Sequence, residues 1–553
     1  NSRLGFYESQ YKAIEEIEDQ FGEMQGVTYE SYLINLYNSV NELAKNPTST
    51  VARSSLIQNA TAFIEKSENV YKGLKDYQTT LNTQVKNMVD SINKLGDKIY
   101  TLNKKISKIE STGIEDANDL RDERDAAIDE LSKYIDITYY ENDSKEVVIS
   151  AEGIPFITMG ELAKMDTRVV EGTNLVIPTW PGYERDVYDL STEASNVDDT
   201  DKGELKGLLI ARGNMVVDYT VVPEAPSSSD YDMSTADGRA AYQEAYNKYY
   251  KAQEYYNTYI EPSAILSAMA GFDKLVNGIV EKINNILCPE KSEVRNNPYM
   301  APDGTEIQAD IYTYNSVSQQ VLFDRYGREV TGTDNGDGTY SFSSGEKLYM
   351  SFGGAEVPVD SYTYSMLDMD KTGYGMDDDK TVGTELFSRK GTDRYIKTTD
   401  DSGKTIYIRN NLNETDYESL YKLGNLQINP EAAQNVGKIP LSTVQGKEDF
   451  DRAKELVDAW DEKFASLNPD TYAKSDFMTF YNNFIGEYAT LGKALGNYVS
   501  NQTTMVNGYD NQRLQSEGVS SDEELEKMIK YQQAYNAASR TSFFSVLSTT
   551  SLA

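Results

Sequence analysis

The side chains best able to do chemistry in this sequence are carboxylates. The chain has 553 residues, with 89 Asp and Glu, no His and a single Cys. Without histidine there is no imidazole base, no Ser-His or Cys-His nucleophile pair, and none of the usual zinc ligand sets. Cys288 cannot form an internal disulfide, and we expect it to be a small buried hydrophobic residue.

One acidic segment partly imitates a calcium-binding loop. Asp368, Asp370, Thr372 and Gly373 follow the spacing of such a loop, and Asp379 stands at its twelfth position. The loop lacks a bidentate Glu at its last position and the two helices that should flank it. An acidic turn between strands is the simpler interpretation.

Pairs of acidic residues at glycosidase-like spacing, such as Asp122 with Asp125 or Asp377 with Asp379, arise by chance among so many carboxylates. No glycine-rich phosphate loop follows a predicted strand. We therefore predict no catalytic residue, no metal site, no cofactor and no enzymatic activity.

The charge of the chain excludes some partners. Lys and Arg number 53 against the 89 acids, which gives a net charge of −36. Such a chain repels phosphate backbones and anionic lipid headgroups, so we expect neither nucleic acid nor membrane as a partner. No apolar run approaches the length that a membrane-spanning helix requires.

A heptad pattern is the main structural signal and centres on residues 74–109. Apolar side chains recur every seven residues at two adjacent positions, which is typical of a coiled-coil seam. With no proline between Pro47 and Pro155, this helix is expected to begin near Thr48 and to run for about 60 residues, roughly 90 Å. The seam residues are Val85, Ile92, Ile99 and Ile106 in one position, and Leu81, Met88, Leu95, Leu102 and Ile109 in the other.

The remaining pattern predicts an α+β multidomain protein: a long coiled-coil helical rod domain with an inserted antiparallel β domain and a C-terminal assembly helix. The rod domain is expected in two parts, 1–287 and 426–512, with a β-hairpin region at about 138–180. Short β-rich runs separated by Asp-Gly, Asn-Gly and Ser-Gly turns predict the β domain at 288–425. Residues 513–553 are expected to be the assembly segment.

Two further helices carry distinctive faces. Seven tyrosines between Tyr242 and Tyr259 lie at helical spacing; we interpret them as a packing surface, with ligand stacking as the alternative. A helix from Ser520 or Ser521, started by a capping box with Glu523 or Glu524, is amphipathic, which indicates either a packed terminal helix or an assembly surface. Its candidate interface residues are Leu525, Met528, Ile529, Tyr531, Tyr535 and Ala538.

The same C-terminal segment resembles the flagellar axial proteins, and within them the hook-associated protein 1 family. The resemblance rests on Gly518-Val519, Asp522 to Glu524, Met528-Ile529, Tyr531 to Tyr535 and Ala537-Ala538. Four more segments match that family in order: ELAKNPTSTVARSSLIQNA from Glu42, NDLRDERDAAIDELS from Asn118, GELKGLLIARGN from Gly203 and LQINPEAAQNV from Leu426. The segments with which family members begin are absent, so we expect an N-terminally truncated chain, and after Arg540 the sequence departs from the family's apolar helix.

The resemblance implies a non-catalytic structural protein at the junction between hook and filament, outside the cell, exported by the flagellar type III route. Its implied partners are the flagellar hook protein, hook-associated protein 3, further copies of itself in the junction zone, and a flagellar export chaperone. The alternative is a surface-exposed carbohydrate- or calcium-binding protein with its site on the 288–425 β domain.

Overall fold

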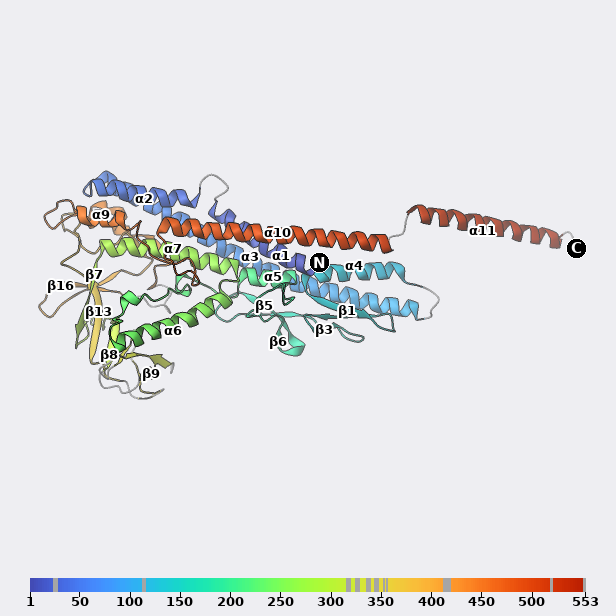
Figure 1. The fold of residues 1–553 in the computed structure, drawn as a ribbon, viewed down its shortest axis with the longest axis horizontal. Helices are drawn as coiled ribbons and strands as arrows, with labels where there is room; N and C mark the ends of the chain where they lie inside the picture. Colours follow the sequence, from blue (N-terminus) through green and yellow to red (C-terminus); the bar gives the residue numbers. More distant parts are fainter. Residues whose placement is uncertain are drawn as a thin grey trace. The chain divides into compact units, whose positions relative to one another are not determined.

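The computed structural model describes residues 1–22, 28–111, 116–314, 320–323, 329–334, 340–342, 348–351, 354, 357–410, 419–517 and 521–550. The chain divides into two compact units, Ser2–Leu495 on the one hand and Asn1 with Gly496–Ala553 on the other. One very long helix, several shorter helices and small antiparallel sheets make up an α+β protein, as predicted (Figure 1).

Helix α3, Thr50–Glu110, is the long helix predicted from the heptad pattern. It begins where the Ser49 hydroxyl accepts a 3.3 Å hydrogen bond from the backbone N–H of Ala52. Most seam side chains are buried, but Met88 is only half-buried and Ile109 is 36% exposed. Val89 is buried beside Met88, so the buried stripe drifts as expected for a helix without a continuous coiled-coil partner.

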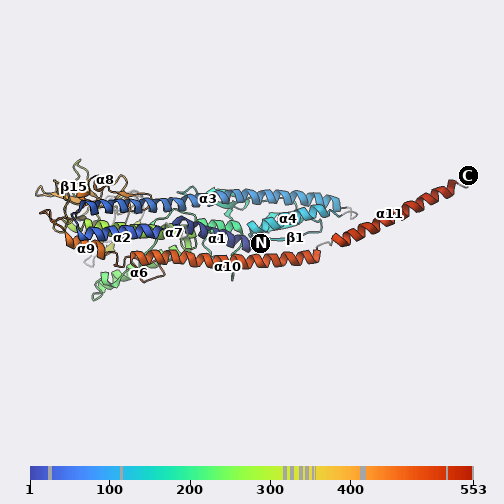
Figure 2. The ribbon, with the colours of Figure 1, turned by 90° about the horizontal axis from the view of Figure 1, so that it is seen from above.

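Several elements cover α3 in turn. Helix α2, Tyr29–Lys45, lies beside its first half, and α4, Asn118–Tyr134, lies beside its second half (Figures 1 and 2). Helices α5, Glu204–Arg212, and α7, Ala264–Leu287, also contact it. The predicted contact between α7 and the long helix is therefore confirmed, but α7 is one neighbour among several.

An aromatic cluster joins four helices of the larger unit. Phe21 ends α1, Ser2–Phe21, and its ring centre lies 5.0 Å from that of Phe272 on α7. Tyr29 of α2 lies 5.0 Å from Phe272, and Phe484 of α10, Phe477–Glu517, lies 5.5 Å from Phe21. All four rings are at most 3% exposed, so this cluster is part of the core.

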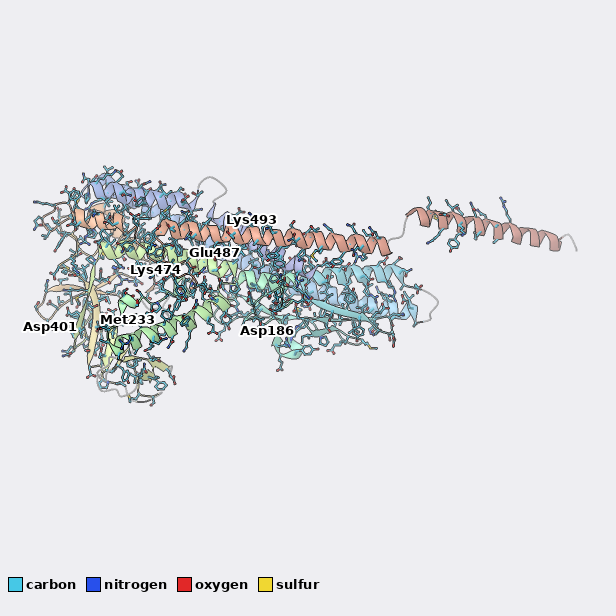
Figure 3. All side chains as sticks on the ribbon, in the orientation of Figure 1. Asp186, Met233, Asp401, Lys474, Glu487 and Lys493 are labelled. Carbon is cyan, nitrogen blue, oxygen red and sulfur yellow. The ribbon has the colours of Figure 1, made fainter. Side chains whose placement is uncertain are left out.

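Two three-stranded antiparallel sheets follow α4, as the period-two pattern predicts. The first contains β1, Ile137–Glu141, β2, Val147–Ala151, and β3, Ile154–Ile157. The second contains β4, Asp166–Val169, β5, Val176–Trp180, and β6, Arg185–Asp186. On its exposed side Arg168 binds both carboxylate oxygens of Asp186, at 2.8 and 2.7 Å (Figure 3).

A larger antiparallel sheet occupies the region after α7. Its strand order is β11-β12-β8-β13-β16-β15, and β7 also pairs with β13. The strands are β7, Glu290–Arg295; β8, Ile311–Tyr314; β11, Thr333–Asp334; β12, Tyr340–Phe342; β13, Ser361–Leu367; β15, Tyr395–Thr399; and β16, Thr405–Arg409. The pairs β9, Val321–Phe323, with β10, Glu329–Thr331, and β14, Phe387–Arg389, with β17, Leu426–Ile428, stand apart.

Sequence patterns predict most of these strands but miss β7 and β13. Strand β13 is central, because it pairs with β7, β8 and β16. Strand β7 is charged along its length, as protected edge strands often are, so it lacks the apolar alternation of a strand. Parts of the predicted runs, at 315, 318–319, 338–339, 347 and 352, lie outside the described residues. The domain limits 288–425 and 426–512 stay a prediction.

The remaining helices are α6, Ala236–Tyr259; α8, Pro430–Gln434; α9, Phe450–Asp458; and α11, Ser521–Thr550, with short 3-10 helices at Pro181–Tyr183, Tyr219–Val221, Ser228–Asp230 and Val436–Lys438. The predicted faces of two helices need correction. Phe450 is 55% exposed because it stands at the first turn of α9, and Leu491 of α10 is 41% exposed. Helix α11 reaches Thr550, so the Ser/Thr-rich segment after Arg540 is helical at least that far.

Candidate functional site

The predicted interface residues lie on α11, within the smaller unit. Leu525, Met528, Ile529 and Tyr535 follow one another at helical steps and lie within roughly a third of the helix circumference. Their exposed fractions are 51%, 59%, 46% and 76%. Tyr531, 74% exposed, and Ala538, also exposed, border this face.

An isolated helix of this kind has apolar and aromatic side chains that only another surface could bury. The side chains that would form the predicted capping box lie outside the described residues; the helix itself begins at Ser521. The face can bind by apolar contact and offers no group for bond-making chemistry. That it is the assembly interface stays a prediction.

The acidic segment at Asp368 is a turn closed on itself. One carboxylate oxygen of Asp368 accepts a 3.1 Å hydrogen bond from the N–H of Asp370, and its carbonyl accepts from the N–H of Thr372 at 2.8 Å. The interpretation as an acidic turn is confirmed. In the part of the chain that the structure describes, no group of three or more Cys, Asp or Glu could hold a metal ion.

Cys288 is fully buried, as expected, and burial raises the pKa of its thiol to about 12. It is therefore a thiol at neutral pH and a poor nucleophile. The helices of the described residues also lack the combination of length and apolar character that a bilayer crossing requires.

The tyrosine-rich helix α6 packs through only part of its stripe. Tyr249 and Tyr256 are 5% and 4% exposed, and the Tyr249 hydroxyl donates to the carbonyl of Pro469. Tyr250, Tyr255 and Tyr259 are instead exposed. The prediction of a packing surface is thus correct for one side of the helix. Within the β-rich region, Tyr299, Tyr312, Tyr314 and Tyr364 belong to the core and form no exposed platform.

Three arginines in the family-like segments have a common structural role. Arg53 is 0% exposed and donates to the carbonyls of Pro47, Gly437 and Ile439 at 2.7, 3.1 and 2.8 Å. It thereby joins the segment that starts at Glu42 to the end of the segment that starts at Leu426. These two segments are nearly 400 residues apart in sequence.

The other two arginines join helices to strands. Arg212 is 0% exposed and donates to the carbonyl of Val176 at 2.8 Å. Arg124, 2% exposed, donates to the Glu141 carboxylate at 2.8 Å. In the segment from Gly203, the Gly207 Cα lies so close to α1 that a Cβ there would stand 2.7 Å from the carbonyl oxygen of Phe6. The family-like segments are therefore places where distant parts of the chain bind each other's main chain.

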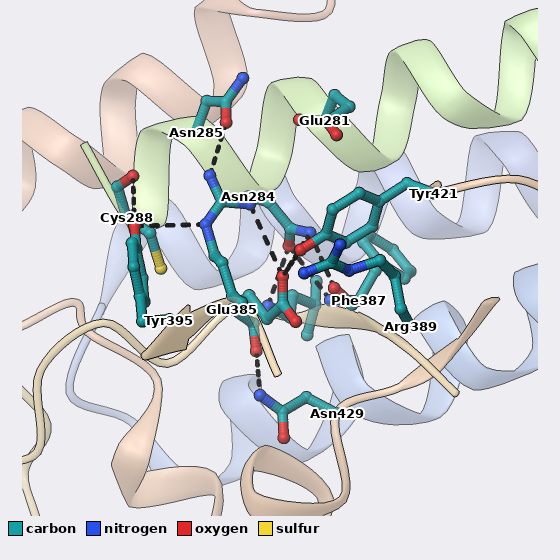
Figure 4. Close-up of polar contacts among 12 residues, drawn as sticks. Glu281, Asn284, Asn285, Cys288, Glu385, Phe387, Arg389, Tyr395, Tyr421 and Asn429 are labelled. Carbon is teal, nitrogen blue, oxygen red and sulfur yellow. Dashed lines mark hydrogen bonds and ion pairs between the residues drawn. The ribbon is translucent and has the colours of Figure 1, made fainter. Parts of the chain in front are cut away.

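A buried polar cluster joins α7 to the β-rich region (Figure 4). One carboxylate oxygen of Glu385 accepts hydrogen bonds from Tyr421 at 2.5 Å and from Asn284 at 3.3 Å, and Arg394 lies 3.6 Å from it. Burial raises the pKa of Glu385 to about 7, against the effect of Arg394, which lowers it. These polar atoms satisfy one another, so the cluster serves attachment, and sequence reasoning missed it because Glu385 stands in no pattern.

The fold and its sites define a structural protein built for packing and attachment around one long helix. The family model described as "Flagellar hook-associated protein FlgK helical domain" matches residues 14–221, which cover most of that helix and both small sheets. Residues 14–221 are therefore an FlgK-type helical domain.

The relatives point to the same protein. The chain is 27% identical over 244 residues to flagellar hook-associated protein 1 of Bacillus subtilis (strain 168), covering 42% of this chain and 48% of that protein. It thus spans about half the length of this curated relative. A solved structure, the flagellar hook junction protein FlgK from Burkholderia pseudomallei, aligns with 94% of this chain and 98% of its own, at 13% identity and a TM-score of 0.49. The first two matches confirm the predicted resemblance to hook-associated protein 1.

Proposed function

We propose that this chain is a structural, non-catalytic component of the bacterial flagellum that joins the hook to the filament. The observation that carries the proposal is the match of residues 14–221 to the FlgK helical domain. It is supported by the relative from Bacillus subtilis, which is named for the hook-associated role.

The proposed location is outside the cell, at the hook-filament junction, after export by the flagellar type III route. The proposed partners are the hook protein on one side, hook-associated protein 3 on the other, neighbouring copies of the chain within the junction zone, and an export chaperone before secretion. A chain with one buried cysteine has no disulfide to form or reshuffle after export, which is compatible with this route.

We place the assembly interface on the α11 face made of Leu525, Met528, Ile529, Tyr531, Tyr535 and Ala538. Five of these side chains are large and apolar or aromatic, and each is at least 46% exposed. Burying such side chains against a neighbouring subunit would stabilise association by roughly 1.5–3 kcal/mol for each aliphatic residue that becomes fully covered.

The proposal is tested in a flagellated bacterium that lacks its own junction protein. Expression of the full-length gene is expected to restore filaments on the hooks, seen by electron microscopy, and to restore swimming. Bare hooks with the protein found in the medium would indicate export without docking. Bare hooks with the protein retained in the cell would overturn the proposed function.

The double variant Leu525→Asp/Met528→Asp tests the interface. Two carboxylates on the α11 face oppose its burial, so the larger unit should still fold while incorporation into flagella falls at least tenfold. Circular dichroism and electron microscopy measure the two quantities. The matched control, Val169→Asp/Val197→Asp, changes two residues of the larger unit that are 60% and 86% exposed, and should give normal filaments. Normal filaments with the α11 variant would exclude this face as the interface.

A further inference from the structure

Three asparagines of α3 bind the main chain of the small sheets in the same way. Asn93 donates to the carbonyl of Met165 and accepts from the N–H of the same residue, both at 2.9 Å. Asn103 does the same with Val147, at 2.8 and 3.0 Å. Asn82 donates to the carbonyl of Asn174 and accepts from the N–H of Val176, at 3.0 and 2.9 Å.

The spacing of these asparagines keeps them on one side of the helix. Asn82, Asn93 and Asn103 are eleven and ten residues apart, and eleven residues make about three turns of an α-helix. The same arrangement occurs on α7, where Asn284 donates to the carbonyl of Phe387 at 2.7 Å and accepts from its N–H at 3.1 Å (Figure 4). The motif therefore recurs on a second helix that holds another strand.

Each asparagine binds main-chain groups where pairing to the next strand has ended. Strand β3 pairs with β2 from Ile149 onward, so Val147 lies beyond it. Strand β6 pairs with β5 only at Thr179 and Trp180, so Val176 lies beyond it. A buried, unpaired N–H or C=O group is unfavourable, and the side-chain amide supplies one donor and one acceptor at the spacing of a peptide group.

The chemistry of the contact selects asparagine. Aspartate keeps the acceptor but presents a carboxylate oxygen to the strand's carbonyl, and leucine has neither donor nor acceptor. Glutamine would hold the strand one methylene farther from the helix. Asn103 and Asn284 are 2% and 0% exposed, so water cannot easily replace either bond.

We propose that Asn82, Asn93, Asn103 and Asn284 are main-chain clamps that fix the axial positions of the β segments on α3 and α7, so that helices and sheets move as one body. Each clamp holds a different segment: the β5 start, the β4 start, the β2 start and β14. The proposal is independent of the flagellar assignment, because it rests on contacts within the larger unit alone.

Amide hydrogen exchange on the full chain tests the clamps, with Asn93→Leu and Asn103→Leu as the variants. Losing two hydrogen bonds to one residue should raise exchange about tenfold in the clamped segment. Asn93→Leu should do so in 163–169 and leave 145–151 unchanged, and Asn103→Leu should do the reverse. Asn87→Leu, the same change at an exposed position of α3, is the matched control and should alter neither segment.

The conservative variant Asn93→Asp separates clamping from packing. It preserves the size of the side chain, so faster exchange in 163–169 is expected from the lost donor alone. Exchange that rises equally in both segments would mean that the asparagines contribute only to global stability, and unchanged exchange in the clamped segments would show that they hold nothing; either result overturns the proposal.

Discussion

Buried arginines in this protein bind main-chain carbonyl groups without a carboxylate partner in their printed contacts. Burial lowers the pKa of Arg53 and of Arg212 to about 10, so both stay charged at neutral pH. Their positions within family-like segments could be identified from the sequence, but their roles could not. An arginine in a helical pattern reads as a solvated residue, and only the fold shows that carbonyls from residues 436–439 and 176 converge on these two side chains.

Asp273 of α7 leads to a prediction about pH. It is 0% exposed and accepts hydrogen bonds from the N–H groups of Tyr219 at 2.9 Å and Leu423 at 2.6 Å. Burial raises its pKa to about 7, opposed by these bonds and by nearby Lys422 and reinforced by Asp218. The folded state therefore binds the proton more tightly than the unfolded state, and the stability from this group is lost as pH rises toward 7.

The test compares the wild type with Asp273→Asn, which does not titrate. Between pH 5 and 7, the wild-type free energy of unfolding relative to the variant should fall by up to about 1.4 kcal/mol per pH unit, and above pH 8 the difference should level off. Urea unfolding followed by circular dichroism measures it. A difference that is constant from pH 5 to 8 would contradict the raised pKa.

At the scale of elements, the sequence predicts what is buried better than what buries it. The heptad pattern locates α3 to within two residues at its start, because buried positions repeat regardless of the covering element. It does not reveal that strands cover part of the seam, since a stripe facing a sheet looks like one facing a helix. Strand β13 was missed because Tyr362 to Ser365 alternate aromatic and hydroxyl side chains without a strong apolar face.

Gly96 of α3 shows how tightly sheet and helix fit. A Cβ at this position would lie 2.6 Å from the Phe156 ring and 2.9 Å from Leu162. Gly96→Ala should therefore lower the free energy of unfolding by roughly 1–3 kcal/mol through overpacking. Gly486→Ala on α10 is the matched control: nothing lies within 4 Å of its Cβ position, so this change should stabilise by roughly 0.5–1 kcal/mol. Chemical unfolding measures both, and equal effects would contradict the close fit.

At the scale of the whole molecule, charge opposes association while the proposed α11 face favours it. The net charge of −36 makes copies of the chain repel one another. Raising NaCl from about 20 mM to about 300 mM shortens the Debye length from roughly 20 Å to roughly 6 Å. Self-association through an apolar face should therefore increase with salt, as sedimentation velocity would show.

The variant Leu525→Asp/Met528→Asp should remain monomeric at both salt concentrations. Association of the wild type that weakens with salt would indicate an ionic contact and would count against the apolar face. The clamp asparagines and the β-rich region are unchanged in this variant, so its folding gives an internal check.

The asparagine contacts described above have a consequence for how the sequence can vary over time. Each asparagine recognises a peptide group, and every residue except proline presents the same peptide group. Val147, Met165 and Val176 can therefore be exchanged for other residues that suit their surroundings without loss of attachment, whereas the asparagines on the helices cannot. Mutational drift can thus accumulate on the sheets while the helices that hold them retain their polar positions, and a library randomised at these strand positions should tolerate far more replacements than one randomised at Asn93 or Asn103.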